Sequence, residues 1–166
     1  NSSNWSKYYT QTANIDASAT SSWSGKFPSI AQGNNYFTGV YDGNGKIISN
    51  LSMGSVSSDY GVGLFSQING ATIKNLILKN INYTYTTSPT FIGGITGNIS
   101  SSGGTIQNCS VTGSITSSNY IGGLVGTRNS GGTAIIKQCW TSVNINATGS
   151  SSNYIGGIIK IGRAHV

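Results

Sequence analysis

Apolar and polar residues alternate along several short runs of the chain. The runs Gly104 to Val111 and Asn144 to Ala147 both show this alternation. A period of two residues is typical of a β-strand with one buried face, because successive side chains of a strand point to opposite sides. Turn-forming pairs such as Asn69-Gly70 separate the runs and leave no room for a helix between them. The pattern predicts an all-β chain of short strands.

A five-residue block recurs along the chain. The sequence Asn-Tyr-Ile-Gly-Gly occurs at 119–123 and again at 153–157, and weaker versions start at Tyr36, Tyr60 and Phe91. Aligned on their glycine, the blocks start at residues 36, 60, 91, 120 and 154, which gives spacings of 24, 31, 29 and 34 residues. Spacings of this size indicate stacked structural repeats.

A second pattern repeats in step with the first. It consists of isoleucine, a polar residue, asparagine or glutamine, and then leucine or cysteine, and it occurs at 48–51, 73–76, 106–109 and 136–139. Two independent patterns that shift together argue against a chance repeat.

A single repeat is too small to bury a core of its own. A neighbour stacked directly above it covers its inward side chains and pairs with its backbone. Parallel strands in successive coils then lie about 4.8 Å apart, and equivalent side chains form ladders along the axis. We therefore predict a parallel β-helix-like solenoid of short strands, truncated at its C-terminal end, in which Ile106 lies beside Ile136.

The amino-acid composition supports this prediction and argues against a disordered linker, a nucleic-acid-binding protein and a membrane-spanning protein. Only 7% of the 166 residues are charged and glutamate is absent, so common helix formers are scarce. Regularly placed apolar residues argue against a disordered linker. The net charge is +6, but the lysines are scattered singly, so nucleic acid is not an expected partner. No stretch reaches the roughly 18 apolar residues of a membrane span.

The two ends of the chain differ from the repeat. We predict lead-in or capping strands over residues 1–35 and the repeat solenoid over residues 36–160. Residues 161–166 match the translation of a sequencing-library adapter, so we treat them as a non-native tail and set His165 aside. The chain lacks an initiator methionine and a signal peptide, so we expect a piece of a longer protein, with further repeats beyond its C-terminal end.

The recurring blocks resemble the GLUG motif of bacterial secreted and surface proteins, named after Gly-Leu-any-Gly. Gly123-Leu124-Val125-Gly126 fits this signature in full, and the blocks at 60–66, 91–97 and 154–160 are similar, although the first lacks the closing glycine. Segments 37–51 and 8–16 are similar to stretches that precede such repeats. The resemblance implies a β-helix-like solenoid in a large extracellular protein, such as an adhesin, or a surface peptidase whose repeats carry no catalytic residue.

Cys109 and Cys139 occupy the same place in the second pattern. Adjacent coils bring such Cα atoms within a disulfide range of roughly 4.4 to 6.8 Å, but parallel Cβ vectors are poor geometry for a bridge. We favour two small apolar members of an inward ladder, with a disulfide as the alternative. Without a neighbouring histidine or acid the pair does not complete a tetrahedral shell, so no metal site is assigned.

The chain has three carboxylates, Asp16, Asp42 and Asp59. Glycoside cleavage generally needs two carboxylates at a set separation. Asp42 lies in a turn and Asp16 ends an alternating run, and both contexts favour structural roles. No serine has both a histidine and an acid to form a triad once His165 is set aside. We therefore assign no catalytic residue and no cofactor, and we predict that this fragment is not an enzyme.

Two sets of side chains remain as candidates for contact with a partner. Asn50, Asn75, Asn108 and Gln138 share one position of the second pattern and form either a hydrogen-bonded ladder at a bend or a column of solvated residues. The aromatic residues that fall outside the recurrent inward positions are Tyr83, Tyr85 and Trp140. Exposed rings of this kind stack on sugars or cover a solenoid end, and we take the three as candidate ligand contacts.

A regular repeat with no convergent ionisable groups predicts a noncatalytic structural or adhesive module of a bacterial extracellular or cell-surface protein. The expected partner is a host glycan or a surface protein. Two alternatives stay open: a polysaccharide-active β-helix module, which needs Asp16 and Asp42 close together, and the repeat region of a surface peptidase.

Overall fold

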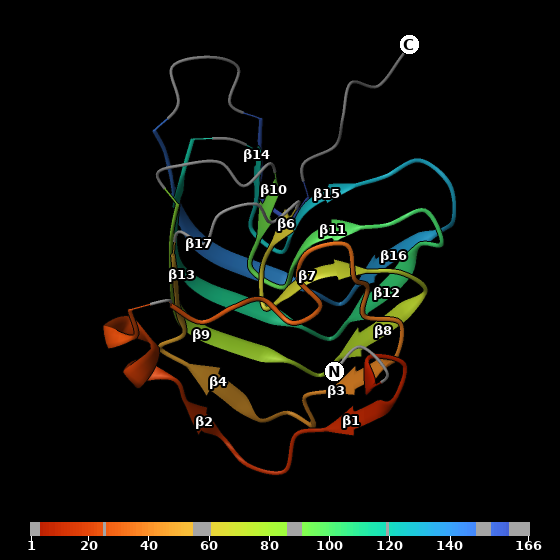
Figure 1. Ribbon diagram of the computed structural model, residues 1–166, viewed down its shortest axis with the longest axis horizontal. Helices are drawn as coiled ribbons and strands as arrows, with labels where there is room; N and C mark the ends of the chain where they lie inside the picture. The colour runs from red at the N-terminus through yellow and green to blue at the C-terminus, as the bar shows by residue number, and fades with distance from the viewer. Residues whose placement is uncertain are drawn as a thin grey trace.

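A computed structural model describes residues 4–24, 26–54, 61–85, 91–118, 120–148 and 154–159. The described residues form short parallel strands and one short 3-10 helix, η2 (Ser18–Ser22). The strands stack into four sheets that wind around one core, which makes a β-solenoid of about four turns (Figure 1). The predicted all-β class and parallel solenoid architecture are confirmed. Within these ranges no helix is long and apolar enough to cross a membrane.

The first sheet contains one strand from each level of the solenoid. Its order is β1 (Tyr8–Thr10), β3 (Val40–Asp42), β8 (Ala71–Lys74), β12 (Gly104–Gln107) and β16 (Ala134–Lys137). The register places Ile106 opposite Ile73 on one side and opposite Ile136 on the other. The predicted ladder of equivalent isoleucines is therefore confirmed.

The second sheet carries the longest strands and follows the first at a corner of each coil. It consists of β2 (Ile15–Asp16), β4 (Ile47–Ser49), β9 (Ile77–Tyr85), β13 (Ser110–Ser117) and β17 (Trp140–Ala147), with β5 (Ser52–Gly54) also paired to β9. Alternate residues of β9 are buried, as expected for strands with one face on the core.

The third and fourth sheets complete each coil. The third contains β6 (Gly61–Val62), β10 (Phe91–Gly93), β14 (Tyr120–Gly122) and β18 (Ile155–Gly156). The fourth contains β7 (Phe65–Ile68), β11 (Thr96–Ile99) and β15 (Val125–Arg128), and isolated bridges from Ile30, Phe37 and Ile159 extend it. Paired residues of the first sheet are 30 to 33 positions apart, so each coil has nearly constant length.

A glycine of the fourth sheet lets its backbone approach the backbone of the third sheet closely. A Cβ added at Gly126 would lie 2.6 Å from the backbone nitrogen of Ile92 and 2.6 Å from the carbonyl oxygen of Gly97. Real Cβ atoms do not tolerate such distances, so only glycine allows the two backbones to approach this closely. Close backbone packing therefore accounts for a glycine at position 126.

The structure corrects the sequence alignment in the N-terminal coils. Ile48 was aligned with Ile73, but it lies opposite Leu78, whereas Tyr41 lies opposite Ile73. In the coil that contains β8 and β9, Asn75 at the corner and Asn80 at the bulge both have positive φ angles and follow an apolar residue by two positions, so the same short pattern occurs twice in that coil. The block at residue 36 was also misaligned with the block at residue 60, because Phe37 pairs with Ile68 in the fourth sheet.

The lead-in predicted over residues 1–35 takes part in the solenoid. Strands β1 and β2 pair with β3 and β4, and Ile30 pairs with Phe65. These residues form a coil of their own at the N-terminal end. The division at residue 35 stays a prediction, and the tail 161–166 lies outside the described residues.

Candidate functional site

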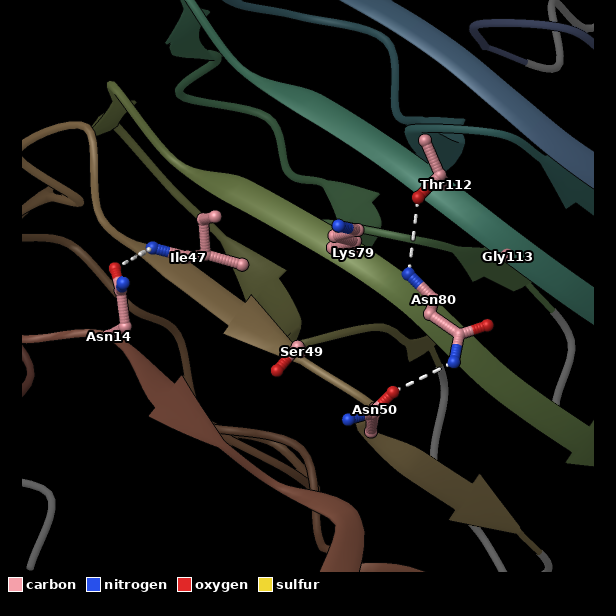
Figure 2. A pocket seen from close by; sticks show the side chains of 8 residues that line it. All are labelled: Asn14, Ile47, Ser49, Asn50, Lys79, Asn80, Thr112 and Gly113. Carbon is pink, nitrogen blue, oxygen red and sulfur yellow. Dashed lines mark hydrogen bonds between the residues drawn. The ribbon is translucent and has the colours of Figure 1, made fainter.

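A polar groove runs along the outer face of the second sheet (Figure 2). One part has a volume of about 660 Å³ and the adjoining part about 530 Å³. Both parts are lined by Asn50, Asn80 and Gly113, so they form one continuous depression. Its lining residues come from several successive levels of the solenoid, which aligns the groove with the stacking direction.

A β-bulge forms the floor of this polar groove. The register of β9 and β13 shifts between Val111 and Gly113. Asn80 and Gly113 both have positive φ angles, 57° and 134°, and the backbone N–H of Asn80 donates to Thr112 Oγ1 at 3.1 Å. A bulge bends its strand and re-aims side chains, and here it opens a hollow on an otherwise regular sheet.

Most residues that line the polar groove carry an amide or a hydroxyl group, and Ile47, Lys79 and Ile81 add aliphatic surface. Asn14 Oδ1 accepts the backbone N–H of Ile47 at 2.9 Å, and Asn80 Nδ2 donates to Asn50 Oδ1 at 2.8 Å. Lys79 is an exposed cation in the lining, and none of the described lining residues is acidic. Such a surface suits a neutral polar ligand with many hydroxyl groups.

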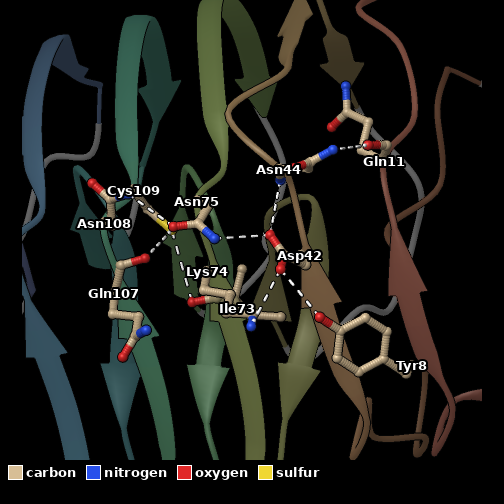
Figure 3. A network of polar contacts seen from close by, with 10 residues as sticks. All are labelled: Tyr8, Gln11, Asp42, Asn44, Ile73, Lys74, Asn75, Gln107, Asn108 and Cys109. Atoms are coloured by element: carbon tan, nitrogen blue, oxygen red, sulfur yellow. Dashed lines mark hydrogen bonds and ion pairs between the residues drawn. The ribbon is translucent and has the colours of Figure 1, made fainter.

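An amide ladder stands at the corner between the first and second sheets (Figure 3). Asn75 Nδ2 donates to Asp42 Oδ1 at 2.9 Å, and Asn108 Nδ2 donates to Asn75 Oδ1 at 2.8 Å. Asn75, Asn108 and Gln138 have φ angles of 53°, 51° and 54°, a left-handed conformation that asparagine tolerates well. The sequence left open whether this position forms a hydrogen-bonded ladder or a column of solvated residues. Asn75 and Asn108 form the hydrogen-bonded ladder.

A second amide ladder stands at a bulge within the second sheet and includes Asn50. Asn50 Nδ2 donates to Asp16 Oδ1 at 3.0 Å, and Asn80 Nδ2 donates to Asn50 Oδ1. Asn50 therefore does not share a column with Asn75, contrary to the sequence alignment. Both ladders begin at an aspartate, so each carboxylate serves as the terminal acceptor of a stack of amides.

These hydrogen bonds favour the ionised form of both carboxylates. The Asn75 amide, with help from the backbone N–H of Asn44 and from Lys74 and Tyr8, lowers the pKa of Asp42 to about 2. Lys74 Nζ lies 3.2 Å from Asp42 Oδ2, and the Tyr8 hydroxyl donates to the same oxygen at 3.1 Å. The pKa of Asp16 is also lowered, chiefly by the amide of Asn50.

Asp16 and Asp42 each belong to a separate amide ladder. Asp16 lies in β2 of the second sheet and Asp42 in β3 of the first, and each is engaged by its own ladder. A general acid for glycoside cleavage needs a raised pKa, whereas both carboxylates have lowered values. Asp59 lies outside the described residues.

The two cysteines lie near the first amide ladder as free thiols. Cys109 is buried and packs in the core, as the inward-ladder interpretation expects, and Cys139 is half-buried against it. Cys109 Sγ donates to the Gln107 carbonyl at 3.1 Å and Cys139 Sγ to the Lys137 carbonyl at 3.2 Å. Interaction with the neighbouring Cys139 thiol, and then burial, raise the pKa of Cys109, whereas interaction with the Cys109 thiol lowers the pKa of Cys139.

Titratable side chains do not gather into a metal site in the part of the chain that the structure describes. No three histidine, cysteine or acidic residues lie together there.

The structure separates the three aromatic candidates. Tyr83 and Tyr85 are 0% and 1% exposed, and the Tyr83 hydroxyl donates to the Gly94 carbonyl at 3.2 Å. The expectation that they lie outside the inward positions was wrong, because the extra residue at Asn80 shifts the phase of β9 and turns both rings inward. Trp140 is 56% exposed, and its contact with a ligand stays a prediction.

Sequence analysis missed an aromatic column at the first position of the recurring block. Phe91 and Tyr120 have ring centroids 5.2 Å apart, and Tyr120 and Tyr154 stack at 4.9 Å with an interplanar angle of 6°. The signal was present in the sequence, because parallel coils in register place equivalent aromatic residues on top of each other.

Comparisons with known proteins give one informative likeness. The chain is 37% identical over 142 residues to halomucin from Haloquadratum walsbyi (strain DSM 16790 / HBSQ001). The matched region covers 82% of this chain and 2% of the length of halomucin. No protein-family model matches the chain, and no solved structure matches it. The chain is therefore related to a small stretch of a much longer protein.

Proposed function

We propose that this chain is a noncatalytic repeat module of a secreted or cell-surface protein, in which the solenoid is a structural wall and its polar groove is an adhesive surface. The observation that carries the proposal is the register of the first sheet. Ile73, Ile106 and Ile136 occupy equivalent positions on successive levels, so these three coils repeat one wall segment. A wall of this kind lengthens by stacking further coils.

The likeness to halomucin supports a surface location. The name denotes a mucin, and mucin-type stalks are extracellular and rich in serine and threonine. This chain is also rich in serine and threonine and poor in charge. Its assignment to the GLUG repeats and a bacterial source remain part of the proposal.

The adhesive part of the proposal rests on the polar groove. Asn50 and Asn80 project amides into it, and the bulge at Gly113 provides its depth. The partner that fits is a host glycan or a glycosylated surface protein, because dense amide and hydroxyl groups match sugar hydroxyls.

The enzyme alternatives receive less support. A polysaccharide-active module would use Asp16 and Asp42, but these carboxylates lie on separate ladders with lowered pKa values. The repeat region of a surface peptidase agrees with the same wall architecture, and its catalytic residues would belong to another part of a longer chain.

A glycan array and a panel of immobilised matrix proteins test adhesion. We expect wild-type binding to at least one neutral glycan and its loss in Ser114→Trp, which fills the groove between Asn82 and Asn144. Thr72→Trp is a matched control, because Thr72 is a half-buried residue of the first sheet outside the groove. If no glycan and no matrix protein binds, the adhesive role is rejected and only the structural role remains.

A further inference from the structure

A smaller hollow lies at the corner between the first and second sheets, beside the first amide ladder. Its volume is about 160 Å³, and its lining includes Asn75, Asn108, Ser110, Gln138 and Trp140. It differs from the polar groove in position and in chemistry, because it combines an indole ring with amide groups. The ladder and the exposed tryptophan were separate candidates in the sequence, and the fold brings them together.

The amides of this corner have unequal hydrogen bonding. Asn75 uses both ends of its amide, since it donates to Asp42 and accepts from Asn108. Asn108 donates its amide nitrogen to Asn75. Within the described residues, Asn108 Oδ1 and the side-chain amide of Gln138 have no hydrogen-bond partner. Both side chains are exposed. Asn108 Oδ1 and the side-chain amide of Gln138, both in the lining, therefore offer one acceptor and one full amide to a ligand in the hollow.

Trp140 supplies an apolar wall beside these amides. It begins β17, directly opposite Ser110 of β13, and it is 56% exposed. The equivalent position on the level below Ser110 is Ile77. The tryptophan thus occurs on a single level of the column, so the hollow is a single feature and not a repeated one.

We propose that this corner hollow binds one neutral sugar residue, with the Trp140 indole against the apolar face of the ring and the amides of Asn108 and Gln138 bonded to its hydroxyls. The proposal rests on the proposed adhesive function and adds a specific subsite for its glycan partner. No charged side chain is among the described lining residues, which disfavours acidic sugars and phosphates. An aromatic face with a few convergent polar groups is the usual composition of a small-ligand site.

Titration with neutral methyl hexosides and methyl N-acetylhexosaminides, followed by amide chemical shifts in NMR, tests the subsite. We expect saturable shifts at residues 108–110 and 138–140 for at least one probe, with one site per chain. Trp140→Ala should weaken binding roughly tenfold or more, because it removes the stacking face. Trp140→Phe should restore part of the affinity, and Asn108→Ala with Gln138→Ala should also weaken binding.

Trp23→Ala is the matched control, since Trp23 is another exposed indole at 48% and lies outside the hollow. Thermal unfolding of each variant establishes that the fold is kept. Equal affinity of wild type and Trp140→Ala would overturn the subsite. Binding that is lost in Ser114→Trp but kept in Trp140→Ala would overturn the subsite and support adhesion through the polar groove. Absence of shifts with every probe overturns the subsite, while the glycan array decides the adhesive function separately.

Discussion

Ile106 and Ile136 lie directly opposite each other in β12 and β16, yet they differ in burial. Ile106 is 0% exposed because Ile73 and Ile136 flank it on both sides, whereas Ile136 is only partly buried. Each level thus depends on the next one to cover its inward side chains. Burial in this fold is a property of the stack and not of the single coil.

The central isoleucine should contribute strongly to stability. We expect Ile106→Ala to lower the free energy of unfolding by about 2 to 5 kcal/mol, because it leaves a cavity between two packed levels. Ile135→Ala, in the same sheet but 43% exposed, should cost well under 1 kcal/mol. Urea unfolding followed by circular dichroism measures both values, and similar losses would argue against the inward ladder.

Gly126 should tolerate no side chain. A methyl group there would collide with the backbone of Ile92 and Gly97, so we expect Gly126→Ala to destabilise the protein by about 1 to 3 kcal/mol or to prevent folding. Gly157→Ala is the control, since an added Cβ meets nothing within 4 Å. Thermal melts compare the two variants. A Gly126→Ala protein as stable as Gly157→Ala would contradict the close approach of the third and fourth sheets.

The Asn75 position combines a hydrogen-bonded amide with a left-handed backbone. Asn75→Gly keeps the backbone conformation and loses the amide, so we expect a loss of about 1 to 3 kcal/mol. Asn75→Ala should be less stable than Asn75→Gly by about 1 kcal/mol, because alanine is strained at a φ of 53°. Chemical denaturation gives both differences, and the reverse order of the two variants would reject the strain argument.

Stability should fall in acid through Asp42. Its pKa is lowered from 3.8 to about 2 in the folded chain, so its contribution is present above pH 4 and is lost as the pH falls from about 4 to 2. Asp42→Asn should be less stable than wild type at pH 7 and should show a flatter decline across that window. Melting temperatures between pH 7 and pH 2 provide the measurement. Parallel curves for the two proteins would show that Asp42 does not carry the acid response.

Much of the fold could be predicted from the sequence, because a parallel solenoid repeats its interior at a fixed interval. Ile106 and Ile136 were correctly matched, as were Tyr120 and Phe91, since the glycines of the recurring block fix a corner of known geometry. The N-terminal coils were harder. Ile48 and Leu78 both stand two residues before a left-handed asparagine, as Ile73 does, and a local pattern does not distinguish the bulge at Asn50 and Asn80 from the corner at Asn75.

The candidate site was predictable only in part. Tyr83 and Tyr85 were misplaced because their orientation depends on a bulge at Asn80, which becomes visible only when the strand is paired with β13. The polar groove is formed by the same bulge, and no short stretch of the sequence indicates it. Trp140 and the amide ladder were each visible in the sequence, but their proximity depends on how β17 stacks above β13.

The near-constant interval of 30 to 33 residues between paired strands of the first sheet also bears on how the chain acquires its structure. Every new level closes a loop of almost the same size onto an edge that already exists, so each step has nearly the same entropic cost. Assembly can then proceed level by level as the polypeptide emerges from the ribosome, with each finished turn serving as the template for its successor.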